Sequence, residues 1–180
     1  VITGIYQQVT GLPANQVFGT GTYLDTARLK RSLGDALNVD PRSIQGYMLG
    51  EHGDSQFAAW STVRVLGQKA DELVTNYHLD LDAVANDARV GGFTVFSGKK
   101  YTNFAIAHAA VSLAQLVLSD AHNEAIVSHY DARFAGYIST PAIIGRSGVV
   151  ANFELTLTAD EQRALQQSAN AIAEKTAAYL

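Results

Sequence analysis

Two short segments of the sequence carry side chains that could move a proton and bind an acid. The first, residues 50–55 (GEHGDS), places His52 on a tight turn between glycines. Histidine is the side chain whose ordinary pKa, about 6.5, suits proton transfer near neutrality. The second segment contains Asp25 and Arg28, which share one face of a predicted helix because they stand three residues apart. Taken alone, these features are a surface histidine and an exposed ion pair.

Considered together, the two segments supply the parts of an acid–base site. Asp25 can orient the imidazole and stabilise its charged form, and Arg28 can bind a substrate carboxylate through two parallel hydrogen bonds. The combination therefore predicts proton transfer on a carboxylate-bearing substrate. A metal-dependent hydrolase that uses His52 with Glu51 and Asp54 is the weaker alternative. Adjacent side chains on an extended turn diverge, whereas a metal site needs about three ligands that converge.

Composition limits what else the chain can do. Its 180 residues, 47% of them hydrophobic, predict one folded domain of moderate size. A formal charge of −4 disfavours nucleic-acid binding. The chain has no cysteine, which excludes disulfides and cysteine-based metal sites and suits a cytoplasmic location. The longest apolar run, residues 104–118, is shorter than the roughly 20 residues that span a bilayer, so we expect no membrane partner. Because the side chains of Glu51 and His52 diverge, we expect no metal either.

The elements that must position these residues can be read from the hydrophobic pattern. Residues 23–37 predict a helix that carries Asp25 and Arg28, and residues 43–49 and 57–65 predict a hairpin-like pair of strands on either side of the His52 loop. Two further helices are predicted, one over 80–89 that breaks or kinks at Gly91-Gly92 and one over 102–121. Strands are predicted over 124–129, 137–145 and 149–157. A last helix follows a capping box at Thr158–Glu161 and carries Leu165, Ile172 and Tyr179 on one face. The predicted fold class is α+β, with long helices packed on a mostly antiparallel sheet.

The first twenty residues have a different character. Residues 1–10 predict the tail of a helix and residues 16–19 a short strand, followed by the turn Gly19-Thr20-Gly21. Strand, glycine turn and helix suggest nucleotide binding. However, Leu24 stands where a dinucleotide-binding loop needs its third glycine, and no acidic residue follows at the required distance. Because Val1 lies inside a predicted helix, we expect the chain to be part of something longer.

The two chemical segments, GTGTYLDTAR (19–28) and GEHGDS (50–55), resemble the L-lactate and malate dehydrogenase family. Within that family, the chain is most similar to the L-2-hydroxyisocaproate dehydrogenases. The segments behind this finer resemblance are YMLGEHG (47–53), WSTVRV (60–65), GGFTV (91–95) and PAIIGR (141–146). The resemblance covers nearly the whole chain and implies the fold of the family's C-terminal catalytic domain.

Carried over to this sequence, the resemblance implies a role for each site residue. His52 would exchange a proton with the C2 oxygen of a 2-oxo or 2-hydroxy acid during hydride transfer with NAD. Asp25 would hold and balance the imidazolium, and Arg28 would bind the substrate carboxylate. Thr102 matches a position beside the substrate pocket, and Ile106 matches an apolar position near the nicotinamide ring.

The resemblance also implies a division of the chain. Residues 1–19 would be the remaining helix and strand of a Rossmann NAD-binding domain, and residues 20–180 the substrate and catalytic domain. We therefore expect a missing N-terminal NAD-binding half, no turnover by the 180-residue chain alone, and assembly as a homo-oligomer. The alternatives are an L-lactate or malate dehydrogenase, and an inactive structural or oligomerisation fragment.

Overall fold

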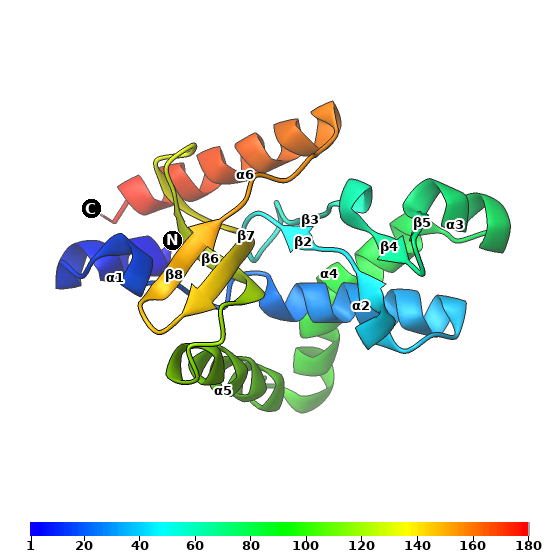
Figure 1. Cartoon of the computed structure of the whole chain (residues 1–180), viewed down its shortest axis with the longest axis horizontal. Helices are drawn as coiled ribbons and strands as arrows, with labels where there is room; N and C mark the ends of the chain where they lie inside the picture. The colour runs from blue at the N-terminus through cyan, green and yellow to red at the C-terminus, as the bar shows by residue number, and fades with distance from the viewer. Residues whose placement is uncertain (180) are drawn as a thin grey trace.

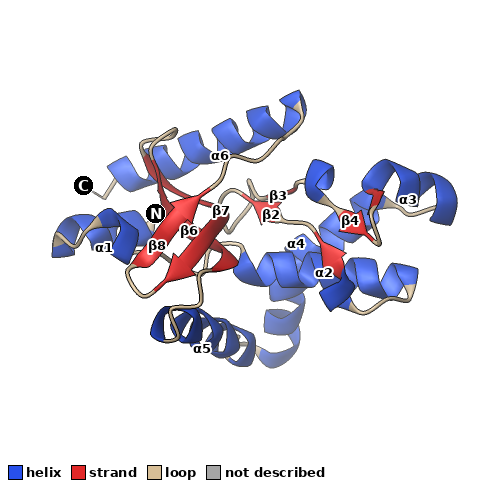
Figure 2. Ribbon diagram, in the orientation of Figure 1, coloured by secondary structure: helices blue, strands red, loops and turns tan. Residues whose placement is uncertain are grey.

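The computed structural model describes residues 1–179 and centres on an antiparallel sheet of three strands. These strands are β6 (Asn123–Asp131), β7 (Gly136–Gly145) and β8 (Gly148–Asn152), with β7 in the middle. Helices α5 (Phe104–Leu118) and α6 (Ala159–Ala177) lie on opposite sides of this sheet (Figures 1 and 2). Ile138 of β7 packs in a cluster with α6, whereas Ala142 and Ile144 pack in a cluster with α5. The middle strand is therefore the core around which the helices gather.

A second group of elements surrounds helix α2 (Tyr23–Leu37), which runs through the middle of the molecule (Figure 1). Leu29 and Leu33 of α2 are completely buried, in a cluster that includes residues of α3 (Ala70–Tyr77) and α4 (Leu81–Lys99). Two small antiparallel ladders complete this part, β2 (Met48–Leu49) with β3 (Phe57–Ala58), and β1 (Ile44–Gln45) with β4 (Arg64–Val65) and β5 (Gln68–Lys69).

The chain begins with α1 (Ile2–Thr10), which Gly11 ends in the left-handed conformation at φ 65°. Helix α1 contacts α6, so the two ends of the chain lie on the same side of the molecule (Figure 1). No helix within residues 1–179 is both long and apolar enough to cross a membrane.

The predicted fold class is confirmed, since the structure combines an antiparallel sheet with long helices. The helix over 23–37 is confirmed, and the hairpin around the His52 loop is present as the pair β2 and β3. The capping box is confirmed too. Thr158 N donates to Glu161 Oε2 at 2.9 Å, and Glu161 N donates to Thr158 Oγ1 at 3.2 Å. Local polar signals thus identified helix starts correctly.

Other expectations were wrong. Residues 16–19 form no strand, and only Gly19 makes an isolated bridge, to Ser128. Helix α4 runs through Gly91-Gly92 without a break, because packing against α2 supports it there. The two hairpin strands are interrupted, one at Gly46 with φ 143° and the other by a short 3₁₀ helix, Trp60–Thr62. Tyr179 lies beyond α6 and is 74% exposed, so it is not part of the buried stripe.

Candidate active site

Three of the residues singled out in the sequence meet at one buried carboxylate. Asp25, in the first turn of α2, is fully buried. Its Oδ1 accepts a hydrogen bond from Arg28 at 2.7 Å, and its Oδ2 lies 2.5 Å from Nδ1 of His52. Asp25 therefore links a guanidinium one turn along the same helix to an imidazole on a separate loop. The Asp25–Arg28 pair is a partly buried link in this site and not an exposed ion pair.

Short polar contacts fix the helix against the strand that leads into the His52 loop. Thr22 Oγ1 donates to the carbonyl of Met48 at 2.6 Å, and the backbone N–H of Met48 donates to Thr26 Oγ1 at 3.0 Å. Both threonines are buried, so these bonds do not compete with water. Gly50 then exchanges backbone hydrogen bonds with Ser139 of β7. The loop that carries His52 is thus held by α2 at its start and by the central sheet.

The environment of His52 favours a charged imidazole. The hydrogen bond with Asp25 raises the pKa of His52 above its ordinary value, against an opposing effect of burial. Because an ionised carboxylate only accepts hydrogen bonds, the hydrogen between the two groups sits on Nδ1. The other ring nitrogen, Nε2, is left to exchange a proton with a ligand, and the side chain is 61% exposed.

Arg28 lies where helices α2 and α4 touch. A Cβ atom on Gly91 would come within 2.9 Å of Cδ of Arg28, and one on Gly92 within 3.5 Å of its terminal nitrogens. The glycine pair thus lets α4 pack directly on the arginine side chain. Within residues 1–179 the side chain of Arg28 makes one hydrogen bond, to Asp25, which leaves further N–H groups for an anion.

These side chains line an open cavity of about 870 Å³ between α2, the His52 loop, α4 and the start of α5. Thr102, in the segment before α5, and Ile106, in the first turns of α5, line the same cavity. The structure therefore brings all five predicted site residues together. Sequence reasoning missed several other lining residues: Gln56, Arg89, Phe93, Phe96, Lys99 and Phe104. Four of them recur every three or four residues along α4, a signal that the expected break at Gly91-Gly92 obscured.

The carboxylate next to His52 points to different partners. Glu51 accepts hydrogen bonds from Lys175 of α6 at 2.7 Å and from Ser55 at 2.8 Å, while His52 pairs with Asp25. Glu51 and His52 thus do not converge on one point. Within residues 1–179, no group of three or more His, Cys, Asp or Glu side chains is placed to hold a metal ion.

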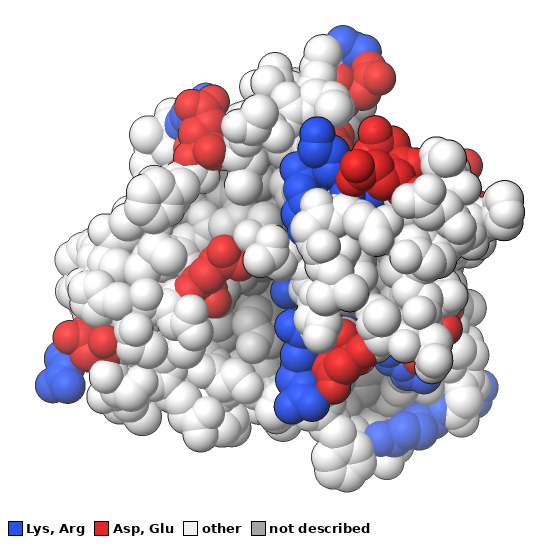
Figure 3. Space-filling view, turned by 45° about the vertical axis from the view of Figure 1, so that its right-hand side comes forward, with Lys and Arg blue, Asp and Glu red and all other residues white. Residues whose placement is uncertain are grey.

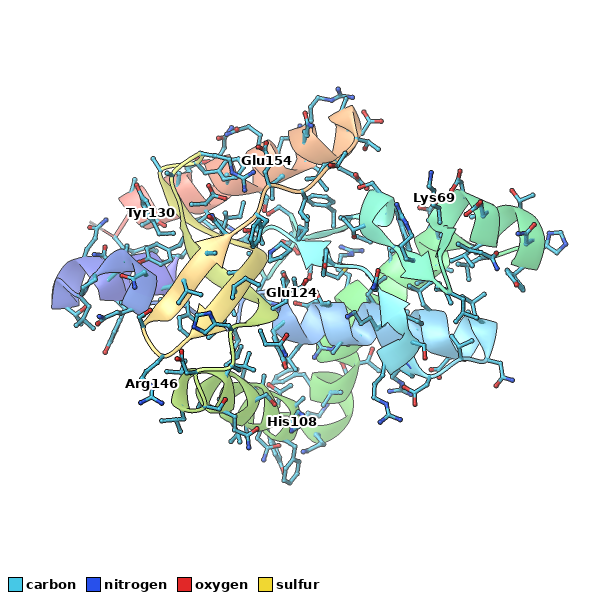
Figure 4. All side chains as sticks on the ribbon, viewed as in Figure 1. Lys69, His108, Glu124, Tyr130, Arg146 and Glu154 are labelled. Carbon is cyan, nitrogen blue, oxygen red and sulfur yellow. The ribbon has the colours of Figure 1, made fainter. Side chains whose placement is uncertain are left out.

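The remaining histidines lie elsewhere. His129 is buried in β6, where its ring nitrogens are 2.9 Å from Thr140 Oγ1 and 3.1 Å from the carbonyl of Tyr130. Burial lowers the pKa of His129, in contrast to His52. His108 lies on the exposed surface of α5, at the edge of the molecule in Figure 4.

Basic and acidic side chains lie next to one another on one face of the molecule. Figure 3 shows Lys and Arg side chains along a hollow that runs down the middle of one face, with Asp and Glu side chains beside most of them. On this face the basic groups do not merge into one continuous patch. An anion would therefore be bound through individual positioned side chains such as Arg28, rather than through a broad positive field.

A proton carrier, its buried carboxylate and an adjacent guanidinium, all facing one cavity, define a site that can bind a small carboxylate and exchange a proton with it. The chain belongs to the lactate/malate dehydrogenase family. Residues 22–178 match the family's alpha/beta C-terminal domain, which is the fold that the sequence resemblance implied.

Several relatives extend this finding. The chain is 37% identical over 177 residues to L-lactate dehydrogenase 3 of Bacillus cereus, covering 93% of this chain and 56% of the relative. It is 34% identical over 181 residues to L-lactate dehydrogenase 1 of Lactobacillus acidophilus, covering 97% and 56%. Among solved structures, the minor L-lactate dehydrogenase of Enterococcus mundtii superposes with a TM-score of 0.91 at 32% identity, covering 96% of this chain and 58% of that chain.

The chain spans a little over half the length of the relatives it matches. The relatives named above are L-lactate dehydrogenases, so they support the family and the general kind of enzyme, but not the finer resemblance to L-2-hydroxyisocaproate dehydrogenases.

Proposed function

We propose that this chain is the substrate-binding and catalytic part of an NAD-dependent L-2-hydroxy-acid dehydrogenase. The observation that carries the proposal is the sharing of buried Asp25 by Arg28, at 2.7 Å, and His52, at 2.5 Å. One carboxylate thus fixes both the proton carrier and the group that binds the substrate acid. The pairing orients them toward one cavity, as a reaction at the carbon next to a carboxylate requires.

Each residue then has a defined task. Arg28 binds the substrate carboxylate through its free N–H groups and so sets which carbon faces the hydride. His52, protonated and held by Asp25, gives its Nε2 proton to the C2 oxygen as a 2-oxo acid is reduced, and removes that proton in the reverse direction. Thr102 contributes a hydroxyl to the cavity wall. Asp25 stabilises the imidazolium and keeps Nδ1 as the nitrogen that faces away from the substrate.

The residues present suit a nicotinamide ring at one side of the cavity. Ile106 and Phe104 provide an apolar wall on α5, against which a flat ring can pack. When bound, the cofactor would supply the hydride as NADH in reduction of the 2-oxo acid and accept it as NAD⁺ in the reverse direction. Contacts to the rest of the dinucleotide belong, in this proposal, to a separate NAD-binding half, because residues 19–24 lack the third glycine of a dinucleotide-binding loop.

Two substrates of different size, both 2-oxo acids, fit the proposal. The similarity to L-lactate dehydrogenases favours lactate and its 2-oxo acid, whereas the segments resembling L-2-hydroxyisocaproate dehydrogenases favour a branched acid. The open cavity of about 870 Å³ has room for either. Homo-oligomer assembly and a cytoplasmic location stay predictions within this proposal.

A fusion enzyme tests the proposal. The upstream part of the Bacillus relative, which this chain does not match, is joined before Val1, and NADH oxidation is followed with pyruvate and with 4-methyl-2-oxopentanoate. We expect turnover by the fusion and none by the 180-residue chain alone. Higher kcat/KM for the branched acid would favour the isocaproate type. A correctly folded fusion that binds NADH but reduces neither acid would contradict the proposal.

A structural or oligomerisation role is the second candidate, favoured by the exposed apolar residues Ile2, Tyr6 and Val9 of α1. Size-exclusion mass and NADH titration of the fusion separate the two candidates. An assembled fusion that binds NADH and turns over neither acid would support the structural role, whereas turnover that is lost in His52→Gln would support the catalytic one.

A further inference from the structure

A closed ring of hydrogen bonds joins the His52 loop to α6. The backbone N–H of Glu51 donates to the Ser168 hydroxyl at 2.7 Å, and the Ser55 hydroxyl donates to the Glu51 carboxylate at 2.8 Å. The two serine oxygens lie 2.9 Å apart. Because the single hydroxyl proton of Ser55 already points to Glu51, the hydrogen between the serines comes from Ser168. The ring begins and ends on Glu51, the residue directly before His52.

Ser168 is a polar residue on the buried, otherwise apolar face of α6. It is completely buried, and the neighbouring buried positions on α6, Leu165, Ala169 and Ile172, are apolar. A hydroxyl in such surroundings is costly unless it is hydrogen-bonded. Ser168 uses both its acceptor and its donor, and both go to the His52 loop. The hydroxyl is thus matched to the loop and not to its own helix.

The loop also approaches α6 closely. A Cβ atom on Gly50 would lie 2.6 Å from the Ser168 oxygen, and Gly50 itself has φ +94°, a conformation that favours glycine. Lys175, two turns further along α6, donates to the second carboxylate oxygen of Glu51 at 2.7 Å. Both oxygens of Glu51 are therefore occupied, and its backbone N–H is held from the same helix.

We propose that Ser168 is a positioning residue for His52. The inference rests on the proposed function of His52 as the proton carrier. Helix α2 supplies the carboxylate that the imidazole must reach, at 2.5 Å, and α6 restrains the backbone one residue earlier. Without the Ser168 hydroxyl, the peptide before His52 can turn, and the short contact with Asp25 is no longer fixed. Displacing a reacting group by even a small distance lowers the rate of a reaction, although the fold is unchanged.

Ring nitrogen NMR on the 180-residue chain tests the proposal without any turnover. The pKa of His52 and the exchange rate of its Nδ1 hydrogen are measured in the wild type, in Ser168→Ala and in Thr176→Ala. We expect Ser168→Ala to move the pKa of His52 down toward its ordinary value and to speed exchange of the Nδ1 hydrogen. Thr176→Ala is the matched control, because that hydroxyl also sits on α6 but donates to the carbonyl of Ile172, and it should change neither.

Any shift in the pKa of His52 in this variant does not come from a lost charge, because Ser168→Ala replaces one neutral side chain by another. The substitution alters none of the charged groups around His52: Asp25 and Arg28 from α2, Glu51 and Asp54 from its own loop, Lys175 from α6 and the amino group of Val1, both beside Glu51, and Arg89 and Lys99 across the cavity from α4. A shift in Ser168→Ala thus reports a change in geometry. Ser55→Ala, which opens the ring but keeps the Glu51 N–H bond to Ser168, should give an intermediate shift.

A lowered melting temperature in Ser168→Ala, with the pKa and the Nδ1 exchange of His52 unchanged, would show a packing role only and overturn the proposal. If Ser168→Ala does not fold, an unchanged pKa in Ser55→Ala overturns it as well. A shifted pKa combined with an inactive fusion enzyme would support the positioning role while removing the proposed dehydrogenase function.

Discussion

The two walls of the cavity are built in contrasting ways. The wall formed by α2 and the His52 loop is held by buried hydrogen bonds, and Thr22 and Asp25 are completely buried. The opposite wall, from α4 and the start of α5, presents Phe93 at 71% and Phe104 at 77% exposure. In the proposed function, hydrogen bonds within the fold thus hold Asp25 and His52 together, whereas the wall that would meet the substrate side chain is open apolar surface.

Removing the proton carrier should have the largest effect on activity. In the fusion enzyme, His52→Gln is expected to lower kcat by on the order of 10²–10⁴-fold, the usual contribution of a positioned acid–base group. The fold should stay intact, because the His52 side chain is 61% exposed. Steady-state NADH oxidation and thermal melting check the two statements. Near-normal turnover in a folded variant would contradict the proposed acid–base role of His52.

Changing the shape of the guanidinium should come next. Arg28→Lys keeps the charge but loses the two-pronged geometry. Since a hydrogen bond to a charged group contributes about 1.5–3 kcal/mol, we expect kcat/KM for the 2-oxo acid to fall roughly 10- to 100-fold, mainly through KM. A variant with unchanged KM would show that the substrate acid binds elsewhere.

A glycine pair tests where the two walls touch. Gly91→Ala places a Cβ atom 2.9 Å from Cδ of Arg28, whereas Gly98→Ala on the same helix meets nothing within 4 Å. The Arg28 side chain would have to move to make room, and a misplaced binding group loses affinity for its ligand, so Gly91→Ala should raise KM roughly tenfold. Overpacking should also lower the free energy of unfolding by about 1–3 kcal/mol. Gly98→Ala should leave KM unchanged and stabilise the protein by up to about 1 kcal/mol, through helix propensity alone. Denaturant melts and KM values are compared. Equal KM values for both variants would show that the packing of α4 does not affect substrate binding by Arg28.

The open wall should be the most tolerant. Phe93→Ser removes a ring that is 71% exposed, so the free energy of unfolding should change by no more than about 0.5 kcal/mol. Its effect should appear instead in the preference between pyruvate and a branched 2-oxo acid, since apolar contacts in a pocket decide such ratios. A large loss of stability with an unchanged preference would place Phe93 in the fixed part of the molecule.

The sequence predicted elements whose signals are local. The capping box at Thr158 and the periodicity of α2 are read within one or two turns, and both were confirmed. The continuity of α4 through Gly91-Gly92 was missed because contacts with Arg28 of α2 offset the weak helix propensity of glycine. Helix α3 was missed as well, because its eight residues give a periodic pattern of only two turns, which is too short to stand out in the sequence.

Part of the candidate site could also be predicted from the sequence. His52, Asp25 and Arg28 could be found because their types and spacing match a known family, and the cavity also includes Thr102 and Ile106. The aromatic wall and Ser168 could not be found in this way. Ser168 lies more than a hundred residues from His52, and a buried serine on an apolar helix face carries no signal until the loop is packed against it.

The pH dependence of the fusion enzyme's rate shows whether His52 and Asp25 act as one acid–base pair. Reduction of a 2-oxo acid needs protonated His52, and Asp25 raises its pKa. We therefore expect kcat/KM to fall as pH rises through a midpoint above the ordinary histidine value, and Asp25→Asn to move this midpoint down. A midpoint unchanged by Asp25→Asn would contradict the claim that His52 and its buried carboxylate act together.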